Sequence, residues 1–495
     1  MMSIAGTEQF LLTSGYWPAP ADDLSHTYMA FLVDRNTLAS TGVDITTSSV
    51  CGGYANLPDG SILINGGNSN GIDRTKVFNR ETLKFQWDYP IYSTRYYATT
   101  VVIPNGYAIV LGGNDATEPD DWRIGLDFRK DYILFKIPTD DDPSPPTTVV
   151  LPVDPHFYQN VLTGYYPISF LLPDENVVTL YDTTGGIIDP MTGQLLAKLP
   201  SLGPDIHFEA RYTATYAPLM MSYEDGYTVV ELVIVGGSTS LDLHSTANSL
   251  SYRISITLAG YREYIIGEWQ VEDTLHPRIL GDMTVLPNGH VVVSGGYQDG
   301  SAGYDHVKVP QLESQIYRPA ALLGSRFTNG PISTVARNYH SSVALTTDGT
   351  LFVAGSEKRP QGFVAEILTP AAFNPHVILP IISSVSADGY TVMYPGSDVL
   401  GLGLGGTFSV MVANLSPLDM AAHNIWATLV APSQSTHGRN SGQRVIKLQP
   451  KTDLADSAFS FQVPTWRGVI PAGWYMLFVM NGMVYSKGVW VTVVN

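Results

Sequence analysis

The chain contains a single cysteine, Cys51, which stands in the sequence Ser-Val-Cys-Gly-Gly-Tyr. A lone thiol can form neither an intrachain disulfide nor a multi-cysteine metal site. Any chemistry at Cys51 therefore needs a partner other than sulfur, such as oxygen and nitrogen ligands or an aromatic ring. Without such a partner we expect Cys51 to be a small buried hydrophobe, because free cysteine is among the most buried residue types.

Three other segments carry side chains that could do chemistry. They are 93–98 (Ser-Thr-Arg-Tyr-Tyr-Ala), 337–342 (Arg-Asn-Tyr-His-Ser-Ser) and 431–444, which contains Thr436-His437 and Gln443-Arg444. Each segment is weak evidence when it is taken alone. The chain has 28 tyrosines and 11 histidines, and a single histidine in a β protein is more often a hydrogen-bonded structural residue than a ligand.

A recurrent turn-and-strand pattern surrounds these segments. In its clearest copies an Asn-Gly or Asp-Gly pair is followed by a run rich in Val, Ile and Leu that ends in glycine, at 57–67, 103–113, 286–296 and 347–355. Such a pair supplies the positive φ angles of a two-residue hairpin turn, and the run that follows is a strand. Degenerate copies occur at 172–180 and 229–237, and we expect a further copy at 29–38.

These units, taken together, predict a repeat architecture. Seven units over about 350 residues give a period near 50, which is typical of kelch repeats and of a β-propeller with four-stranded blades. We therefore expect an all-β protein in which residues 1–375 form a seven-bladed kelch-type β-propeller. An array of β-sandwiches is the alternative, since regular strands with turn signals also suit sandwiches.

The glycine-rich repeat ends near residue 375, and the sequence that follows predicts a second domain. Strand-like runs occur there at 407–412, 425–430, 444–448, 459–463, 474–479 and 488–493. Six strands in about 120 residues are typical of a small Ig-like β-sandwich. We expect this domain to span residues 376–495.

Charge and hydropathy exclude several partners. The formal net charge of -18 argues against nucleic acids and anionic membranes, because both attract positive surfaces. No apolar run approaches the roughly 18–20 residues of a membrane span, so no transmembrane segment is expected. The first ten residues lack a basic region followed by an apolar one, so no secretory signal peptide is visible.

The chain resembles the copper radical oxidases, the family of glyoxal oxidase and galactose oxidase, and it is most similar to the glyoxal oxidase branch. That family shows a Cys ahead of a Gly-rich hairpin, an Arg-aromatic-Tyr motif one blade later, an Arg-x-Tyr-His-Ser motif, and a Thr-His followed by Gln-Arg in the last domain. All four motifs occur here in the same order, and the resemblance runs from about residue 25 to the end of the chain. It implies that the C-terminal sandwich is of the early-set type.

The resemblance also implies the roles of five residues. Tyr97, Tyr339, His340 and His437 would bind copper, and His437 would come from the C-terminal domain. A thioether bond would join the sulfur of Cys51 to the ring of Tyr97, and the cross-linked tyrosine would form a radical. Tyr339 would take the hydroxyl proton of the substrate.

The chemistry of this ligand set agrees with copper. Two imidazoles and two phenolates suit Cu(II) better than zinc, and a bound cation favours phenolate although free tyrosine titrates near about 10. One copper cycles one electron, whereas oxidation of an alcohol or a hydrated aldehyde requires two. A second redox centre is therefore needed, and the cross-linked tyrosine would supply it.

The expected reaction is the oxidation of small aldehydes, as hydrates, or of primary alcohols, with reduction of O2 to H2O2 and without flavin or nicotinamide. The alternative is a kelch-propeller binding or structural shell protein with a vestigial or secondary copper site. A hydrolase is not supported, because no Ser-His-Asp or HExxH pattern is present.

Two departures from close glyoxal oxidases affect substrate preference and compartment. Tyr96 stands where they have Trp between the Arg and the Tyr, and it is the residue most easily confused with Tyr97, which the motif places two after Arg95. The secretion signal and extra cysteines of that branch are not visible, although the resemblance implies an extracellular protein. The aromatic residue that typically stacks on the thioether is not identified by the sequence, and Trp17 and Trp122 are available for this role.

Overall fold

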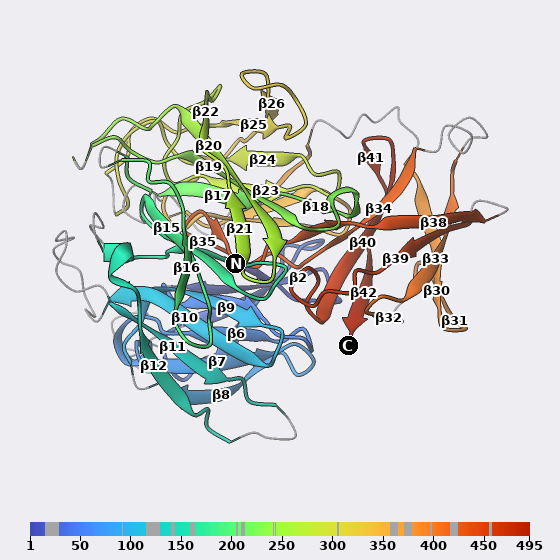
Figure 1. Cartoon of the computed structure of the whole chain (residues 1–495), viewed down its shortest axis with the longest axis horizontal. Helices are drawn as coiled ribbons and strands as arrows, with labels where there is room; N and C mark the ends of the chain where they lie inside the picture. Colours follow the sequence, from blue (N-terminus) through green and yellow to red (C-terminus); the bar gives the residue numbers. More distant parts are fainter. Residues whose placement is uncertain are drawn as a thin grey trace.

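The computed structural model is all-β, which confirms this part of the predicted fold (Figure 1). In the described residues the regular elements are short strands and the 3-10 helices η1 (Ser69–Gly71), η2 (Pro155–Tyr158) and η4 (Tyr223–Asp225). None of the helices in this part of the chain is long and apolar enough to span a membrane. The described residues are 1–14, 29–91, 93–114, 129–139, 144–158, 164–203, 206–208, 213–240, 242, 244–303, 306–356, 365–370, 379–396, 398–415, 424–454 and 458–495.

Seven antiparallel sheets follow one another along the described chain as far as Leu368. In six of these sheets the strands pair with their neighbours in chain order, so the first strand lies at one edge; the fifth sheet departs from this order and also takes in the strands Ser435–Thr436 and Arg439–Asn440 from the C-terminal part. The first sheet contains β1 (Met2–Ser3), β2 (Gln9–Ser14), β3 (Met29–Asp34) and β4 (Ser40–Asp44), and the second contains β5 (Gly53–Asn56), β6 (Ile62–Asn65), β7 (Arg74–Asn79) and β8 (Lys84–Pro90). The third contains β9 (Tyr96–Ile103), β10 (Tyr107–Asn114), β11 (Asp131–Lys136) and β12 (Thr148–Pro152). The fourth contains β13 (Ile168–Leu171), β14 (Val177–Tyr181), β15 (Thr184–Ile188) and β16 (Leu195–Lys198). The next three contain β17 (Ala214–Pro218), β19 (Val229–Gly236), β20 (Leu250–Gly260), β21 (Glu263–Ile266), β22 (Gln270–Asp273); β23 (Asp282–Val285), β24 (Val291–Ser294), β25 (Glu313–Tyr317), β26 (Phe327–Ile332); and β27 (Ser342–Leu345), β28 (Leu351–Ala354), β29 (Glu366–Leu368).

The predicted Asn-Gly and Asp-Gly turns join the first two strands of their sheets, but they are not two-residue turns. In the hairpin between β5 and β6, the Gly60 N–H donates to the Leu57 carbonyl and the Leu57 N–H donates to the Ser61 carbonyl, which encloses three residues. Only the glycine has a positive φ, 87° at Gly60. The side chain of Asp59 instead accepts a hydrogen bond from the Ser61 N–H (2.9 Å), which explains why Asp or Asn precedes the glycine.

The copy expected at 29–38 occupies a different place in its sheet. It connects the third and fourth strands, β3 and β4, rather than the first and second. Its turn is the same as the turn between β7 and β8: the Oδ1 atoms of Asp34 and Asn79 each accept from two backbone N–H groups, and Leu38 and Leu83 both have positive φ. The turn motif is local, so the sequence does not show which pair of strands it joins.

The C-terminal part consists of two sheets, and the six strand-like runs predicted there are strands within two residues at each end. The predicted boundary near residue 375 lies outside the described residues. The strands of the two sheets are β30 (Ile381–Ala387), β31 (Tyr390–Met393), β32 (Leu400–Gly403), β33 (Thr407–Ala413), β34 (Ile425–Val430), β37 (Val445–Lys447), β38 (Gln449–Leu454), β39 (Ala458–Gln462), β40 (Gly473–Asn481), β41 (Val484–Tyr485) and β42 (Val489–Val494).

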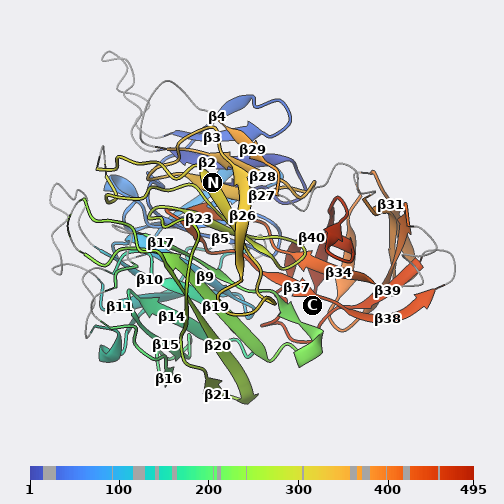
Figure 2. The same cartoon turned by 90° about the horizontal axis from the view of Figure 1, so that it is seen from above.

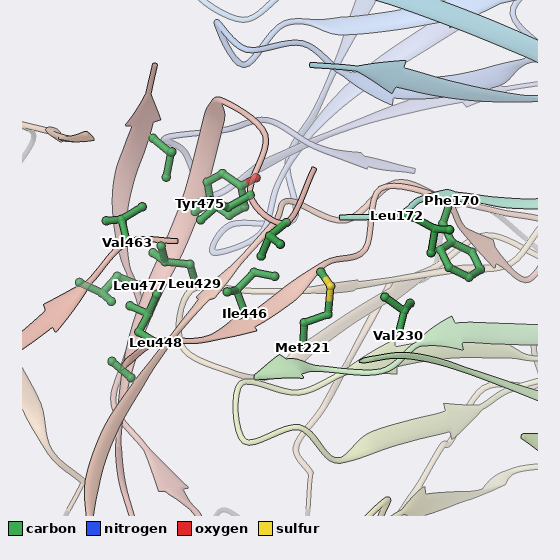
Figure 3. Close-up of a cluster of buried hydrophobic side chains, with 14 of the residues drawn as sticks. Phe170, Leu172, Met221, Val230, Leu429, Ile446, Leu448, Val463, Tyr475 and Leu477 are labelled. Atoms are coloured by element: carbon green, nitrogen blue, oxygen red, sulfur yellow. The ribbon is translucent and has the colours of Figure 1, made fainter. Parts of the chain in front are cut away.

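These two sheets lie to one side of the earlier sheets in both views (Figures 1 and 2). Contact between the two parts is extensive, because β18 (Met221–Ser222) joins the C-terminal sheet beside β37. One buried cluster contains Phe170 and Val230 from the earlier sheets together with Leu448 and Tyr475 from the C-terminal ones (Figure 3). The C-terminal part is thus held against the earlier sheets by a shared apolar core.

A short hairpin leaves the C-terminal sheets and enters the earlier part of the molecule. It consists of β35 (Ser435–Thr436) and β36 (Arg439–Asn440), and Figure 1 shows β35 among the earlier sheets. β36 pairs in parallel with β17, where Arg439 lies opposite Tyr216. This hairpin, residues 435–440, is called the inserted hairpin below, and it carries His437 at its turn.

Candidate metal centre

The structure brings all five residues singled out by the sequence into one cluster. The Sγ atom of Cys51 lies 3.6 Å from Nε2 of His340 and 3.5 Å from Nε2 of His437. The hydroxyl groups of Tyr97 and Tyr339 are hydrogen-bonded to each other. The rings of His340 and His437 are 4.4 Å apart, and the His437 ring is 5.2 Å from that of Tyr97 and 4.9 Å from that of Tyr339.

Four of the five side chains are shielded from solvent. The exposed fractions of Cys51, Tyr97, Tyr339 and His437 are 4%, 2%, 3% and 4%, whereas His340 is half-buried. The cluster therefore combines a closed interior with one more open side at His340, as a site that admits a small molecule requires.

Three of the four segments of the cluster lead into, or begin, the first strand of a sheet. Cys51 precedes β5, Tyr97 is the second residue of β9, and Tyr339-His340 precede β27. The Tyr97 N–H donates to the Cys51 carbonyl at 2.9 Å, which joins neighbouring sheets directly at the site. First strands that lie next to one another thus carry residues distant in sequence to a common centre.

The backbone at the site is left-handed at residues other than glycine. The φ angles of Cys51, Tyr97, His340 and His437 are 56°, 64°, 65° and 52°. Such conformations cost roughly 1–3 kcal/mol each and persist only where the surrounding structure imposes them. Leu280 has the same conformation (φ 57°) just before β23 without carrying a reactive group, so part of this strain belongs to the repeated fold.

The arginines of the two Arg-x-Tyr motifs are structural. Nη1 of Arg95 donates to the Gly112 carbonyl (3.3 Å), and Nη1 of Arg337 donates to the Gly355 carbonyl (2.9 Å). In each case the glycine lies near the end of the second strand of the sheet that the arginine precedes. Arg278 makes the same bond to Gly295 (2.8 Å) ahead of β23, where no tyrosine follows. The motif is therefore a repeated backbone clamp, and only its tyrosine is specific to the site.

The inserted hairpin places His437 through contacts on both sides. Nη1 of Arg439 donates to the Ala214 carbonyl at 2.7 Å. A side chain at Gly438 would collide with the Gly281 carbonyl, so the turn approaches that backbone closely. Oγ1 of Thr436 lies 2.7 Å from Nδ1 of His437, which satisfies that nitrogen and leaves Nε2 facing the cluster.

The Gln-Arg part of the last motif does not reach the cluster. The guanidinium of Arg444 donates to the carbonyls of Gly468, Val469 and Leu171, which ties the base of the inserted hairpin to β13. Arg444 thus supports the junction between the two parts of the molecule.

The electrostatics of the cluster fit a bound cation. Burial, followed by the nearby His340, lowers the pKa of His437 well below its usual value, so its imidazole is neutral and its lone pair is free to bind a metal. Burial raises the pKa of the Tyr97 phenol well above its ordinary value, so a phenolate there needs a cation beside it. Atoms of Cys51, His340 and His437 that could bind a metal lie within 4.8 Å of one another, and two phenol oxygens are in the same cluster. The two imidazoles and the two phenols together form a nitrogen-and-oxygen set that suits Cu(II).

Two further tyrosines, Tyr165 and Tyr166, belong to the cluster and were not found in the sequence. The Tyr166 ring lies 5.3 Å from Tyr97 and 4.8 Å from His437, and its hydroxyl donates to the Gly52 carbonyl at 3.0 Å. The Tyr165 ring is tilted against Tyr97 at 4.9 Å. Trp17 and Trp122, the residues available by type, lie outside the described residues.

A repeat-based signal could have found this pair. Tyr165-Tyr166 lie just before β13, and Tyr96-Tyr97 begin β9. The Tyr166 N–H donates to the Tyr97 carbonyl as the Tyr97 N–H donates to the Cys51 carbonyl. Alignment of the segments just before each first strand would therefore have placed Tyr166 beside the site.

Two family models match the chain. Residues 21–366 match the glyoxal oxidase N-terminus, and residues 392–493 match the galactose oxidase-like early set domain. The second match agrees with the predicted C-terminal sandwich of the early-set type.

Curated relatives and a solved structure are also similar to the chain. Aldehyde oxidase GLOX of Vitis pseudoreticulata is 26% identical over 94% of this chain and 85% of its own length. Galactose oxidase of Gibberella zeae is 28% identical over 41% of this chain and 27% of its own length. A fungal alcohol oxidase solved in complex with copper superposes with a TM-score of 0.75 at 20% identity, over 100% of this chain and 96% of that one, which shows a shared fold.

Proposed function

Since this chain belongs to the glyoxal oxidase branch of the copper radical oxidases, we propose that it oxidises small aldehydes, as their hydrates, or primary alcohols with dioxygen. A hydrated aldehyde would give the carboxylic acid and an alcohol would give the aldehyde. In both cases two electrons and two protons pass to O2, which leaves as H2O2. The branch of the family and the name of the aldehyde oxidase relative favour aldehydes.

The observation that carries the proposal is the convergence of Cys51, Tyr97, Tyr339, His340 and His437 from four separate segments. We assign His340, His437, Tyr97 and Tyr339 as copper ligands. A binding or shell protein would have no need to bury two phenols against two imidazoles, because each buried polar group costs free energy unless it is paired.

Bound copper would supply a one-electron redox centre and a cation that stabilises phenolate. Tyrosine side chains of the protein would accept the proton and the hydrogen atom that leave the substrate. Tyr339 would accept the hydroxyl proton of the substrate. The hydrogen bond between Tyr339 and Tyr97 holds their two phenol oxygens next to each other. Tyr97 would remove the hydrogen atom from the substrate carbon, and the burial of Tyr97 protects it from competing reactions in water.

Cys51 would become a thioether to the Tyr97 ring. The new C–S bond replaces one S–H and one ring C–H bond, so two electrons and two protons leave, and dioxygen takes them. The two residues lie in one buried cluster and are joined by a backbone hydrogen bond. This cross-link would give the tyrosine the role of the second redox centre.

We further propose that the seven successive sheets are the blades of a closed propeller within residues 1–375, with their first strands around a central axis. Contacts between first strands support this arrangement, as in the pairs β5 with β9 and β23 with β27. The first and last sheets also pack together, because the rings of Phe10 and Phe352 stack at 4.7 Å. Residues 376–495 would then be the early-set domain.

The experiment is to load the purified chain with copper in air and to measure its products. We expect the intact mass to fall by two hydrogen atoms, Cys51 to resist alkylation, and one tryptic species to contain both Cys51 and Tyr97. Peroxide production would then be compared for glyoxal, methylglyoxal, glycerol, benzyl alcohol and galactose, with Cys51→Ser as the control. Separate Cys51 and Tyr97 peptides would contradict the radical mechanism, and copper binding without peroxide from any substrate would favour the binding or shell protein.

A further inference from the structure

The two histidines of the site belong to different parts of the molecule. His340 leads into β27 of the last sheet, whereas His437 lies on the inserted hairpin that comes from the C-terminal part. A metal site tolerates little error in the placement of its ligands, so the relative position of these two segments must be set by contacts between them.

One buried carboxylate contacts both segments. Asp282, the first residue of β23, is 2% exposed. Its Oδ2 accepts a hydrogen bond from Oγ of Ser341 at 3.1 Å, and its Oδ1 accepts one from Oγ of Ser435 at 2.9 Å. Ser341 directly follows His340, and Ser435 stands two residues before His437.

Ser435 also bonds directly to β27 and so interlocks the inserted hairpin with that strand. Oγ of Ser342 donates to the Ser435 carbonyl at 3.1 Å, and the Val343 N–H donates to Oγ of Ser435 at 3.3 Å. Asp282 therefore stands at the junction of three elements, β23, β27 and the inserted hairpin.

A charged residue at this position is not a feature of the repeat. Asp282 stands two residues after the left-handed Leu280. The residues two after left-handed Cys51, Tyr97, Tyr166 and His340 are Gly53, Thr99, Ile168 and Ser342, all of them uncharged. Burial of a carboxylate is costly, and it raises the pKa of Asp282 to about 7. The sheet itself gives no reason to place a carboxylate there; the carboxylate faces the Met1 ammonium and Arg337, and its hydrogen bonds come from Ser341 and Ser435.

We propose that Asp282 is a positioning residue that holds the His340 segment and the inserted hairpin at the separation which the metal requires. The two oxygens of one carboxylate are a fixed distance apart, so hydroxyl donors from the two segments must keep a fixed relation to each other. Asp282 touches neither substrate nor metal in this role. The inference rests on the proposed function only in that His340 and His437 bind copper.

The test compares Asp282→Ala and Asp282→Asn in the full chain. The alanine variant removes both acceptors, and we expect copper to bind about 10–100-fold more weakly, with an altered Cu(II) EPR spectrum. The asparagine variant keeps the shape of the side chain, and the serine hydroxyls can turn to pair with its carbonyl oxygen and its amide. We expect it to restore the affinity and the spectrum.

Matched variants distinguish an effect on the stability of the fold from an effect on the placement of the two histidines. Ser341→Ala and Ser435→Ala each remove one of the two bonds and should each weaken copper binding. Ser460→Ala removes a buried hydroxyl that pairs with Ser409 on β33, in a C-terminal sheet that carries no residue of the cluster, and should leave copper binding unchanged. Thermal unfolding without copper measures how much each variant costs the fold, and if Asp282→Ala does not fold, the two serine variants carry the test.

Wild-type affinity and EPR spectrum in a folded Asp282→Ala would overturn the inference, as would an asparagine variant that fails like the alanine variant while both serine variants bind normally. A wild-type chain that binds no copper would overturn the proposed function instead. In that case crystal structures of the metal-free variants still decide the inference, because loss of Asp282 should change the separation of the His340 and His437 rings, which is 4.4 Å here.

Discussion

The sheet that begins with β9 and the sheet that begins with β23 share the same arginine clamp and the same left-handed residue, but they place different side chains at that residue. Arg95 and Arg278 both clamp a glycine carbonyl of their own sheet, and Tyr97 and Leu280, two residues later, both have left-handed backbone. One sheet thereby presents a phenol to the centre of the molecule and the other presents an alkyl side chain. The fold sets where a side chain points, and the residue type at that point decides whether chemistry follows.

The largest effect should come from His437, the one proposed copper ligand that lies on the inserted hairpin. His437→Ala removes an imidazole nitrogen from a buried site where no other described side chain replaces it, so we expect loss of copper binding and of activity. Metal analysis after dialysis measures this loss. Stoichiometric copper in the variant would show that the early sheets hold the metal without the inserted hairpin.

Cys51→Ser should separate metal binding from redox chemistry. Serine keeps the size of the side chain but cannot form the thioether, so we expect copper to remain bound while turnover falls about 100-fold or more, the upper end for changes beside metal ligands. Copper content and peroxide production measured on the same sample test this. Full turnover in Cys51→Ser would mean that the cross-link has no role.

Paired substitutions at the two clamps sharpen the comparison between the sheets. Arg95→Met and Arg278→Met each leave a buried glycine carbonyl without its donor, which should cost about 1–3 kcal/mol of unfolding free energy in both variants. Denaturant titration measures this cost. Only Arg95→Met should also reduce the yield of the Cys51–Tyr97 cross-link, because only its sheet presents a reacting residue; equal yields in the two variants would argue against this division.

The smallest effect concerns strain away from the site. Leu38 has φ 56° in an exposed turn, so Leu38→Gly should stabilise the protein by about 1 kcal/mol without changing activity. Thermal unfolding and the peroxide assay provide the two measurements. A change in activity would show that the β3–β4 turn influences the site at a distance.

The sequence predicted local features well and spatial relations less completely. The turn at Pro58-Asp59-Gly60 was recognisable because a glycine with positive φ and an aspartate that bonds the following backbone are local requirements. The copy expected at 29–38 joins the third and fourth strands of its sheet, which the sequence did not show, since a turn motif carries no information about its place in a sheet. Tyr166 was missed because its segment lacks the arginine of the Arg-x-Tyr motif, with Gly164 two residues before it, and because its place beside Tyr97 depends on where β13 lies.

By itself the sequence determined the all-β class, the repeated hairpins and the residue types of the site, because turn chemistry and side-chain identity are properties of short segments. Only the tertiary structure decided that Arg95 is a clamp, that Tyr165 and Tyr166 adjoin Tyr97, and that Asp282 joins the segments of the two histidines. These relations join residues that are far apart along the chain. They exist because strand pairing and a shared apolar core bring the first strands and the inserted hairpin together. No pattern within a short segment predicts that these elements lie side by side.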